Sequence, residues 1–339
     1  MATRAEKVDS PEKGANRRSL PDWLRTPGGM ALVVSAFLAC LAMWAIWSEL
    51  GQPFGGYVSY SFTENRPSIV ASETPAWWPV LATRQLTLTD TLVAIDGQPY
   101  MANARRVYAA AAAEGRMVTV LAVNQETGVE RLVTIEPTPI TAADIVDVKL
   151  PESLIAIAFW LLALLVLRAR PASITNQVFA IAASAVAIHR AVALPSLFFD
   201  GQLLQLMATS GHLITAGLIG PLLVHLALVF PTPLPRQRPR LLRTLYALGL
   251  ASGVVGVATR LPWSVRVPLP VTLAVGDGSY LVMLLLLLAG VVALFSRLVW
   301  SWFNERRTRR QRQATVIILV GLLTALPRVV IMLLPLLRD

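Results

Sequence analysis

Long apolar runs follow one another along most of the chain and are joined by short polar connections. A helix that crosses a hydrocarbon core of about 30 Å needs about 20 mostly apolar residues, since it rises about 1.5 Å per residue. We therefore predict a polytopic α-helical membrane protein with about seven spans, at residues 29–50, 154–167, 175–194, 206–230, 242–259, 278–298 and 315–336. The second run is short unless Pro151 begins it, and the fifth is glycine-rich and ends early.

Residues 51–149 break this pattern with short runs in which apolar and polar positions alternate, as in half-buried strands. Asp96-Gly97 indicates a turn, and a helix is expected to be capped by Asn103 and to end at Gly115. Strands are expected at 57–63, 68–72, 92–95, 118–123 and 131–135. The pattern predicts an inserted α+β domain, placed between a first span at 29–50 and a six-span bundle at 151–339.

Composition supports lipid as the solvent for most of the chain. Hydrophobic residues make up 55% and charged residues 15%, with a mean hydropathy of +0.59, whereas soluble domains carry about 25% charged residues. The single cysteine, Cys40, excludes an internal disulfide and any metal site built on paired cysteines.

The basic residues give the predicted spans a direction. The tail at 1–28 and the connections after the second, fourth and sixth spans hold most of the 30 Lys and Arg residues, and these regions share one side of a seven-span arrangement. Because short basic connections stay in the cytoplasm, the tail is expected to be cytoplasmic and the domain at 51–149 extracytoplasmic. Clusters beside spans serve orientation and contacts with anionic lipid, so we expect no nucleic-acid partner.

Ionisable side chains inside spans are costly and are therefore candidate functional residues. His212 and His225 lie thirteen residues apart, about 220° around a helix, and so do not form a two-histidine metal pair. Hydrogen bonding between helices is the alternative role for the histidines, and pairing with a carboxylate or reaching an interface is the alternative for the arginines. The candidates are His189, Arg190, His212, His225 and Arg328.

Enzyme and transporter motifs are missing from the sequence. A zinc protease needs His-Glu-x-x-His, which does not occur, and the string 208–211 lacks the first glycine of a rhomboid-type Gly-x-Ser-Gly. No internal repeat of the kind found in transporters stands out. We expect no catalytic residue, no metal and no cofactor.

A motif in the inserted domain resembles a known family. Residues 86–99 read Leu-Thr-Leu-Thr-Asp-Thr-Leu-Val-Ala-Ile-Asp-Gly-Gln-Pro and are similar to the GLxxGDxIxxIDGxxV signature of bacterial PDZ domains, with Thr89 in place of a glycine. The resemblance implies strand addition of an extended peptide. It places the groove along Ser68, Ile69, Val70, Ala71 and Ser72 and on the helix face that carries Val107. A spacer domain without a peptide ligand is the alternative.

A second motif concerns the membrane region. Residues 220–233, which include Gly220-Pro221 and Phe230-Pro231, resemble the multispan sensor regions of bacterial histidine kinases of the quorum-sensing peptide-receptor type, and residues 309–314 with the run that follows are similar too. The resemblance implies the bacterial inner membrane and a non-catalytic sensory or receptor module. In such proteins a kinase follows an eighth span, so this is either the membrane part of a longer kinase or a stand-alone relative. A membrane scaffold that recruits envelope proteins is the alternative. The expected partners are lipid, a peptide or protein ligand, and a second copy in a homodimer.

Overall fold

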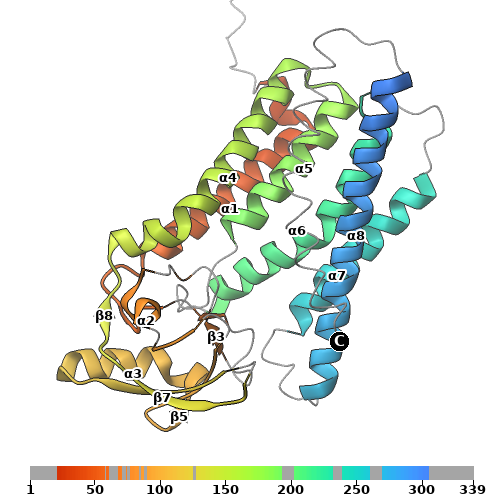
Figure 1. Ribbon diagram of the computed structural model, residues 1–339. Helices are drawn as coiled ribbons and strands as arrows, with labels where there is room; N and C mark the ends of the chain where they lie inside the picture. The colour runs from red at the N-terminus through yellow and green to blue at the C-terminus, as the bar shows by residue number, and fades with distance from the viewer. Residues whose placement is uncertain are drawn as a thin grey trace, which may run out of the picture.

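The protein is described from a computed structural model, which covers residues 21–57, 59–60, 68–70, 74, 77–83, 85–87, 90–124, 127–192, 202–231, 239–259 and 269–304. Most of these residues are helical (Figure 1). The long helices are α1 (Pro27–Trp47), α4 (Ala142–Ala169), α5 (Ile174–Ala191), α6 (Gln202–Val229), α7 (Pro239–Ala258) and α8 (Leu269–Asn304). A 3-10 turn at Asp22–Arg25 precedes α1.

The helices form two groups that meet at α5 and α6. Helix α5 contacts α1 and α4, and helix α6 contacts α7 and α8. The two groups are joined because α5 also lies against α6. Figure 1 shows the small strand-containing domain at one end of α1 and α4, with the chain entering it from α1 and leaving it into the antiparallel α4.

Five helices in the described part of the chain are long and apolar enough to cross a membrane, namely α1, α4, α7 and most of α6 and α8. They coincide with five of the predicted spans. The predicted span at 175–194 coincides with α5, which is not among the five, since Asn176, Gln177, His189 and Arg190 make its ends polar. The predicted span at 315–336 lies outside the described residues.

The start of α4 corrects the predicted boundaries at 149 and 154. The helix begins at Ala142, where the hydroxyl of Thr141 accepts from the N–H of Asp144 and the Asp144 carboxylate accepts from the N–H of Thr141. This reciprocal capping fixes the start of a helix. Pro151 lies inside α4 rather than at its beginning. The inserted domain therefore ends near residue 141.

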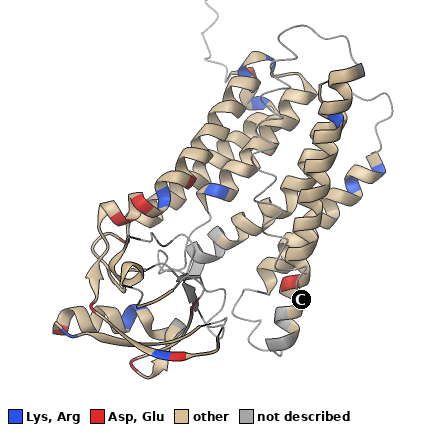
Figure 2. Ribbon diagram, viewed as in Figure 1, with Lys and Arg blue, Asp and Glu red and all other residues tan. Residues whose placement is uncertain are grey.

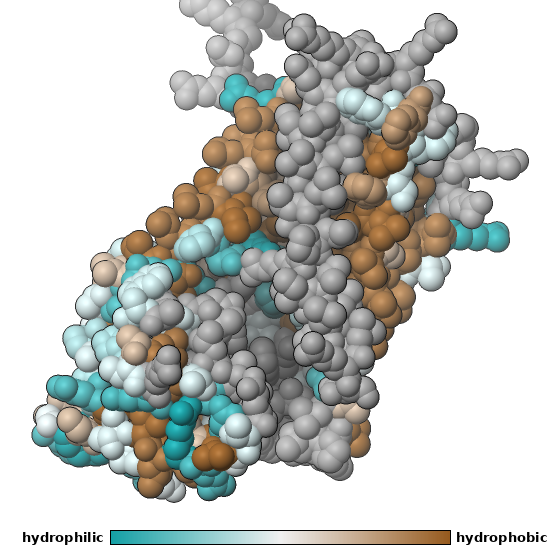
Figure 3. Space-filling model, in the orientation of Figure 1, coloured by the Kyte–Doolittle hydropathy of each residue, from teal (hydrophilic) through white to brown (hydrophobic). Residues whose placement is uncertain are grey.

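The outer surfaces of these helices are apolar. Exposed large side chains on α1 include Met30, Phe37 and Trp44, and those on α4 include Leu154 and Leu165. Figure 3 shows this hydrophobic surface along the helices, above a domain whose surface is mixed. Apolar patches of this size need a non-aqueous partner, so the chain is a membrane-embedded protein.

The inserted domain is built on one antiparallel sheet with helix α3 (Tyr100–Glu114) packed against it. The strand order is β2-β3-β4-β6-β7, and β5 pairs with β4. The strands of this sheet are β2 (Ser59–Tyr60), β3 (Ser68–Val70), β4 (Thr91–Ile95), β5 (Gln98–Pro99), β6 (Val118–Val123) and β7 (Glu130–Ile135). The predicted strands at 92–95, 118–123 and 131–135 are confirmed.

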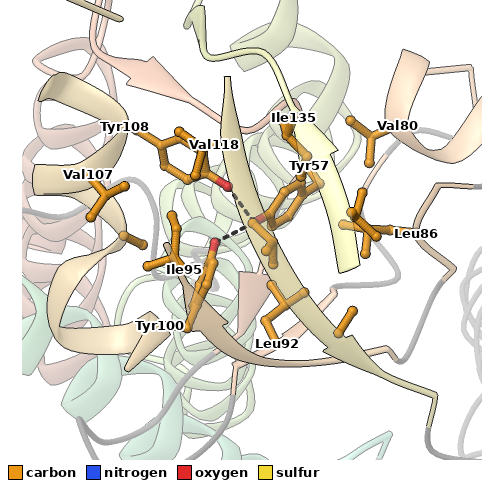
Figure 4. Packing of buried hydrophobic residues seen from close by; sticks show 14 of the residues in the cluster. Tyr57, Val80, Leu86, Leu92, Ile95, Tyr100, Val107, Tyr108, Val118 and Ile135 are labelled. Carbon is orange, nitrogen blue, oxygen red and sulfur yellow. Dashed lines mark hydrogen bonds between the residues drawn. The ribbon is translucent and has the colours of Figure 1, made fainter. Parts of the chain in front are cut away.

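Three tyrosines form the polar centre of the domain core. The Tyr57 hydroxyl is hydrogen-bonded to those of Tyr100 and Tyr108, at 2.7 Å each (Figure 4). Burial, reinforced by the two neighbouring phenols, raises the pKa of Tyr57 well above its ordinary value. The three hydroxyls therefore stay neutral and satisfy one another among Leu92, Ile95 and other apolar side chains.

The turn after β4 fits the prediction, and the start of α3 does not. Asp96 and Gly97 both have positive φ, 47° and 74°, as a tight hairpin turn requires. Gly115 ends α3 in the left-handed conformation. Helix α3, however, begins at Tyr100, and Asn103 lies in its first turn, where its side-chain amide donates to the carbonyl of Pro99.

The Asp96 carboxylate makes the stability of the domain depend on pH. Burial by itself raises the pKa of Asp96, but the N–H of Thr119 and the guanidinium of Arg116 donate to the carboxylate and lower the pKa overall. A carboxyl group whose pKa is lower in the folded chain than in the unfolded chain stabilises the fold at pH values above its unfolded pKa of about 3.9. This contribution is lost as the pH falls through the pKa of the folded chain.

We therefore expect Asp96→Asn, which tolerates positive φ, to be less stable than the wild type at neutral pH. The difference should shrink as the pH falls below about 4. Thermal unfolding of both chains across this pH range measures it, and a difference that stays constant with pH would contradict the assignment.

Candidate functional site

The strand predicted to accept a peptide lies inside the sheet. Ile69 of β3 pairs with Tyr60 of β2 on one side and with Thr91 of β4 on the other. Ser68 is paired with Leu92 of β4 and Val70 with Ser59 of β2, so only Ile69 has a described partner on both edges. A peptide therefore cannot add to the strand at Ile69. Strand addition at Ile69 is excluded by this pairing. The rest of the groove stays a prediction, and Ala71 and Ser72 lie outside the described residues.

Val107 does not line an open groove either. Its side chain is 6% exposed and belongs to the core cluster between α3 and the sheet. Figure 4 shows it on the inner side of α3 together with Tyr108 and Ile95. The sequence placed Val107 on the correct helix, but its face packs against β4 and β6 and is closed to a ligand.

Two of the predicted intramembrane histidines meet at the contact between α5 and α6. The rings of His189 and His212 stack, with centroids 4.1 Å apart and planes 16° apart. Nδ1 of His189 lies 3.2 Å from the carbonyl oxygen of His212, and Nδ1 of His212 lies 3.3 Å from that of His189. Because a carbonyl only accepts, each Nδ1 carries a proton and donates it.

Arg190 extends this contact to α4. Its NH1 group lies 3.1 Å and 3.3 Å from the two carboxylate oxygens of Glu152, and the side chains are 25% and 18% exposed. Glu152 follows Pro151 in α4. His189, Arg190, His212 and Glu152 thus form a polar cluster that joins α4, α5 and α6, and we call it the three-helix polar cluster.

The other predicted polar residues are separate from this cluster. Nδ1 of His225 on α6 lies 3.0 Å from the hydroxyl of Tyr246 on α7, and the two rings meet edge to face. Arg328 lies outside the described residues. Among the described residues no three His, Cys, Asp or Glu side chains are grouped so as to hold a metal ion.

An ion pair with a buried carboxylate connects the inserted domain to the end of α1. Glu49 follows α1 and its side chain is 4% exposed, while Arg105 on α3 is 34% exposed. Their closest atoms, Oε2 of Glu49 and NH1 of Arg105, lie 3.0 Å apart. A carboxylate so thoroughly removed from water depends on its partner, so the pair holds α3 against the end of α1.

Backbone pairing joins the chain that leaves α1 to the chain that enters α4. Strand β1 (Pro53–Phe54) pairs with β8 (Thr138–Pro139), and Ile140 exchanges backbone hydrogen bonds of 2.9 Å with Gly51 and Gln52. Apolar side chains cover this ladder, and Trp78 meets Phe54 edge to face at 5.6 Å between ring centroids. The cluster contains Ile46, Phe54, Trp78, Ile140, Ile145 and Val148.

This ladder, its apolar cover and the Glu49–Arg105 pair together form a junction that clamps the domain to α1 and α4. Neither Glu49 nor Glu152 was predicted from the sequence as a functional residue. Each is an acidic residue within a turn or so of the end of an apolar run, which is the signal that marks a costly charge near lipid. Their partners are 56 and 38 residues away, so their pairing was not predictable.

Comparison with models of protein families, with curated proteins and with solved structures gives no match for this chain.

Proposed function

We propose that this chain is a membrane sensory or receptor module in which a protein or peptide bound to the inserted domain alters the packing of the membrane helices. The observation that carries the proposal is the junction. It fixes the domain to two helices at once, by β1–β8 pairing and by the Glu49–Arg105 pair. A displacement of the domain then moves the ends of α1 and α4.

The three-helix polar cluster gives such a movement a route into the bundle. Glu152 lies on α4, the helix that the junction holds, and it pairs with Arg190 on α5. Next to Arg190, His189 stacks on His212 of α6. Polar contacts between apolar helices are either made or broken. The cluster could therefore distinguish two arrangements of α4, α5 and α6, as a switch between two helix packings requires.

The distribution of charge supports an extracytoplasmic domain. Arg25, Arg168, Arg170, Arg240 and Arg243 lie near the helix ends farthest from the domain, and Figure 2 shows basic residues at that end of the bundle. The basic side of a membrane protein faces the cytoplasm. We propose a bacterial inner-membrane location with the domain outside.

The order of strands, helix and hairpin supports a PDZ-like class for the domain, with its ligand site away from β3. The alternative function, a scaffold that recruits envelope proteins, is favoured by apolar side chains on the outer face of the sheet. Leu132 is 73% exposed and Val93 is 42% exposed. A sensor and a scaffold differ in whether a change at the junction reaches α5.

Removal of the Arg105 charge tests this difference. We expect Arg105→Gln to speed hydrogen exchange about tenfold at the end of α1 and the start of α4, because loss of a hydrogen-bonded ion pair to the buried Glu49 carboxylate costs about 1.4 kcal/mol or more. In a sensor the faster exchange extends to α5 around Arg190. The measurement uses the full chain in lipid nanodiscs.

The matched control is Arg106→Gln on the same helix. Arg106 is exposed and, within the described part of the chain, donates to the side chains of Gln98 and Asn103, so its loss should leave the helices unchanged. If Arg105→Gln loosens the junction and leaves α5 as it was, the scaffold is correct. If the two variants behave alike, the junction is not the coupling element.

A further inference from the structure

Two adjacent tryptophans in the inserted domain have opposite surroundings. Trp78 is 5% exposed and packs on Phe54 inside the junction, whereas Trp77 is 68% exposed. The indole Nε1–H of Trp77 donates to Oδ2 of Asp147 on α4, at 3.2 Å. Trp77 therefore presents an apolar ring outward beside a membrane helix, with its one polar atom satisfied.

The apolar outer surfaces of α1 and α4 show where the hydrocarbon ends. On α4 the exposed apolar side chains run from Val146 to Leu165, which spans about 29 Å at the helical rise of about 1.5 Å per residue. On α1 they run from Met30 to Trp47, about 26 Å. Both lengths approach the hydrocarbon thickness of about 30 Å, but Asp147, Lys149 and Glu152 lie in the first turns of this stretch of α4. The polar interface on the domain side therefore lies between Val146 and Leu154 on α4 and close to Trp47 on α1.

The domain-side ends of α1 and α4 are close to each other, because Ile46 and Ile145 belong to one buried cluster. Asp147 follows shortly after Ile145 on α4, and Trp77 is bound to it. Figure 3 shows the hydrophobic surface of the helices continuing to the edge of the domain.

We propose that Trp77 lies in the lipid interface on the domain side and seats the inserted domain on the bilayer surface. Tryptophan prefers this region because its ring is apolar while its N–H needs a polar partner. Lipid is the occupant that the geometry favours, because the ring continues the lipid-facing surfaces of α1 and α4. The domain is then supported by the membrane as well as by the junction.

Quenching of tryptophan emission by nitroxide lipids tests the proposal on the full chain in nanodiscs. The difference between the wild type and Trp77→Phe isolates the emission of Trp77, and the same difference for Trp78→Phe isolates a buried neighbour. We expect headgroup-labelled and shallow acyl-labelled lipids to remove most of the Trp77 emission and little of the Trp78 emission. Equal, weak quenching of both components would overturn the proposal.

A site-directed probe gives an independent measurement. Cys40→Ser leaves a chain without cysteine, into which Trp77→Cys, Phe37→Cys or Leu132→Cys introduces one label site. We expect a fluorescent label at 77 to be quenched most by shallow nitroxides, a label at 37 by deep ones, and a label at 132 on β7 by neither. If the label at 77 behaves like that at 132, or its emission depends on the ratio of protein to lipid, Trp77 faces water or a second copy and the proposal fails.

Discussion

Replacement of Gly217 on α6 by alanine is expected to push α6 and α7 apart and to destabilise the bundle by about 3 kcal/mol, at the upper end of the range for overpacked interiors. A Cβ at this position would lie 2.2 Å from the carbonyl oxygen of Gly249 on α7. The reverse holds as well, since a Cβ on Gly249 would lie 2.3 Å from the carbonyl oxygen of Gly217. The two backbones are in direct contact, and no side-chain rotation relieves the clash.

The same kind of contact joins α6 to α8. A Cβ on Gly220 would lie 2.3 Å from the carbonyl oxygen of Leu286, and a Cβ on Gly290 would meet the carbonyl oxygen of Gly220. Small residues permit such close approach in lipid, where burial of apolar side chains gives little drive for helices to associate. Helix α6 is thus held by backbone contacts to α7 and α8 and by the histidine pair to α5.

Unfolding of the full chain by a graded series of detergent mixtures measures the effect of Gly217→Ala. The matched control is Gly278→Ala on α8, where a Cβ would meet nothing within 4 Å. Alanine favours a helix over glycine by about 1 kcal/mol, so the control should be neutral or slightly stabilised. If Gly217→Ala and Gly278→Ala unfold at the same detergent composition, the backbones of α6 and α7 are not in direct contact.

The sequence predicted those parts of this fold that depend on local pattern. The lengths of the apolar runs predicted α1, α6, α7 and α8, and the alternation of apolar and polar positions predicted β4, β6 and β7. Gly115 ended α3 as expected because a left-handed residue after a helix favours glycine. Each of these features depends on residues within one element or its immediate flanks.

Features that depend on long-range pairing were not predictable. A strand was predicted at 68–72 but its two neighbours were not, and β2 and β4 leave no edge at Ile69 for the strand addition that the resemblance implied. The sequence marked His189, Arg190 and His212 individually, but not that Glu152 and the stacking of two helices bring them together. Such contacts follow from tertiary packing, which one sequence does not contain as a local signal.

Asp90 carries the second large expected effect, and it belongs to the motif that resembles PDZ domains. Its carboxylate is fully buried and accepts hydrogen bonds from the backbone N–H of Thr87 at 2.6 Å, the hydroxyl of Thr87 at 2.7 Å and the side-chain amide of Asn124 at 3.2 Å. The guanidinium of Arg131 on β7 pairs with it as well. One side chain thus ties the segment before β4 to both strands of the β6–β7 hairpin at its loop end.

Asp90→Asn is expected to destabilise the inserted domain by about 3 kcal/mol, the lower end of the cost of breaking a buried ion pair, because Arg131 remains partly exposed to water. The side-chain NH2 of asparagine would also face the N–H and O–H groups that donate to the Asp90 carboxylate. Hydrogen exchange of the β6 and β7 amides in the full chain measures the loss. Glu130→Gln, an exposed change one residue before Arg131, is the control and should exchange like the wild type.

A double variant separates the ion pair from the rest of the Asp90 network. If the penalty comes mainly from the uncompensated Arg131 charge, Asp90→Asn combined with Arg131→Leu should be more stable than the sum of the two single variants. If the effects simply add, the bonds to Thr87 and Asn124 carry the cost instead. Either result locates what holds the hairpin to the sheet, and exchange at the β1–β8 junction in the same variants shows whether the domain core can loosen without releasing α1 and α4.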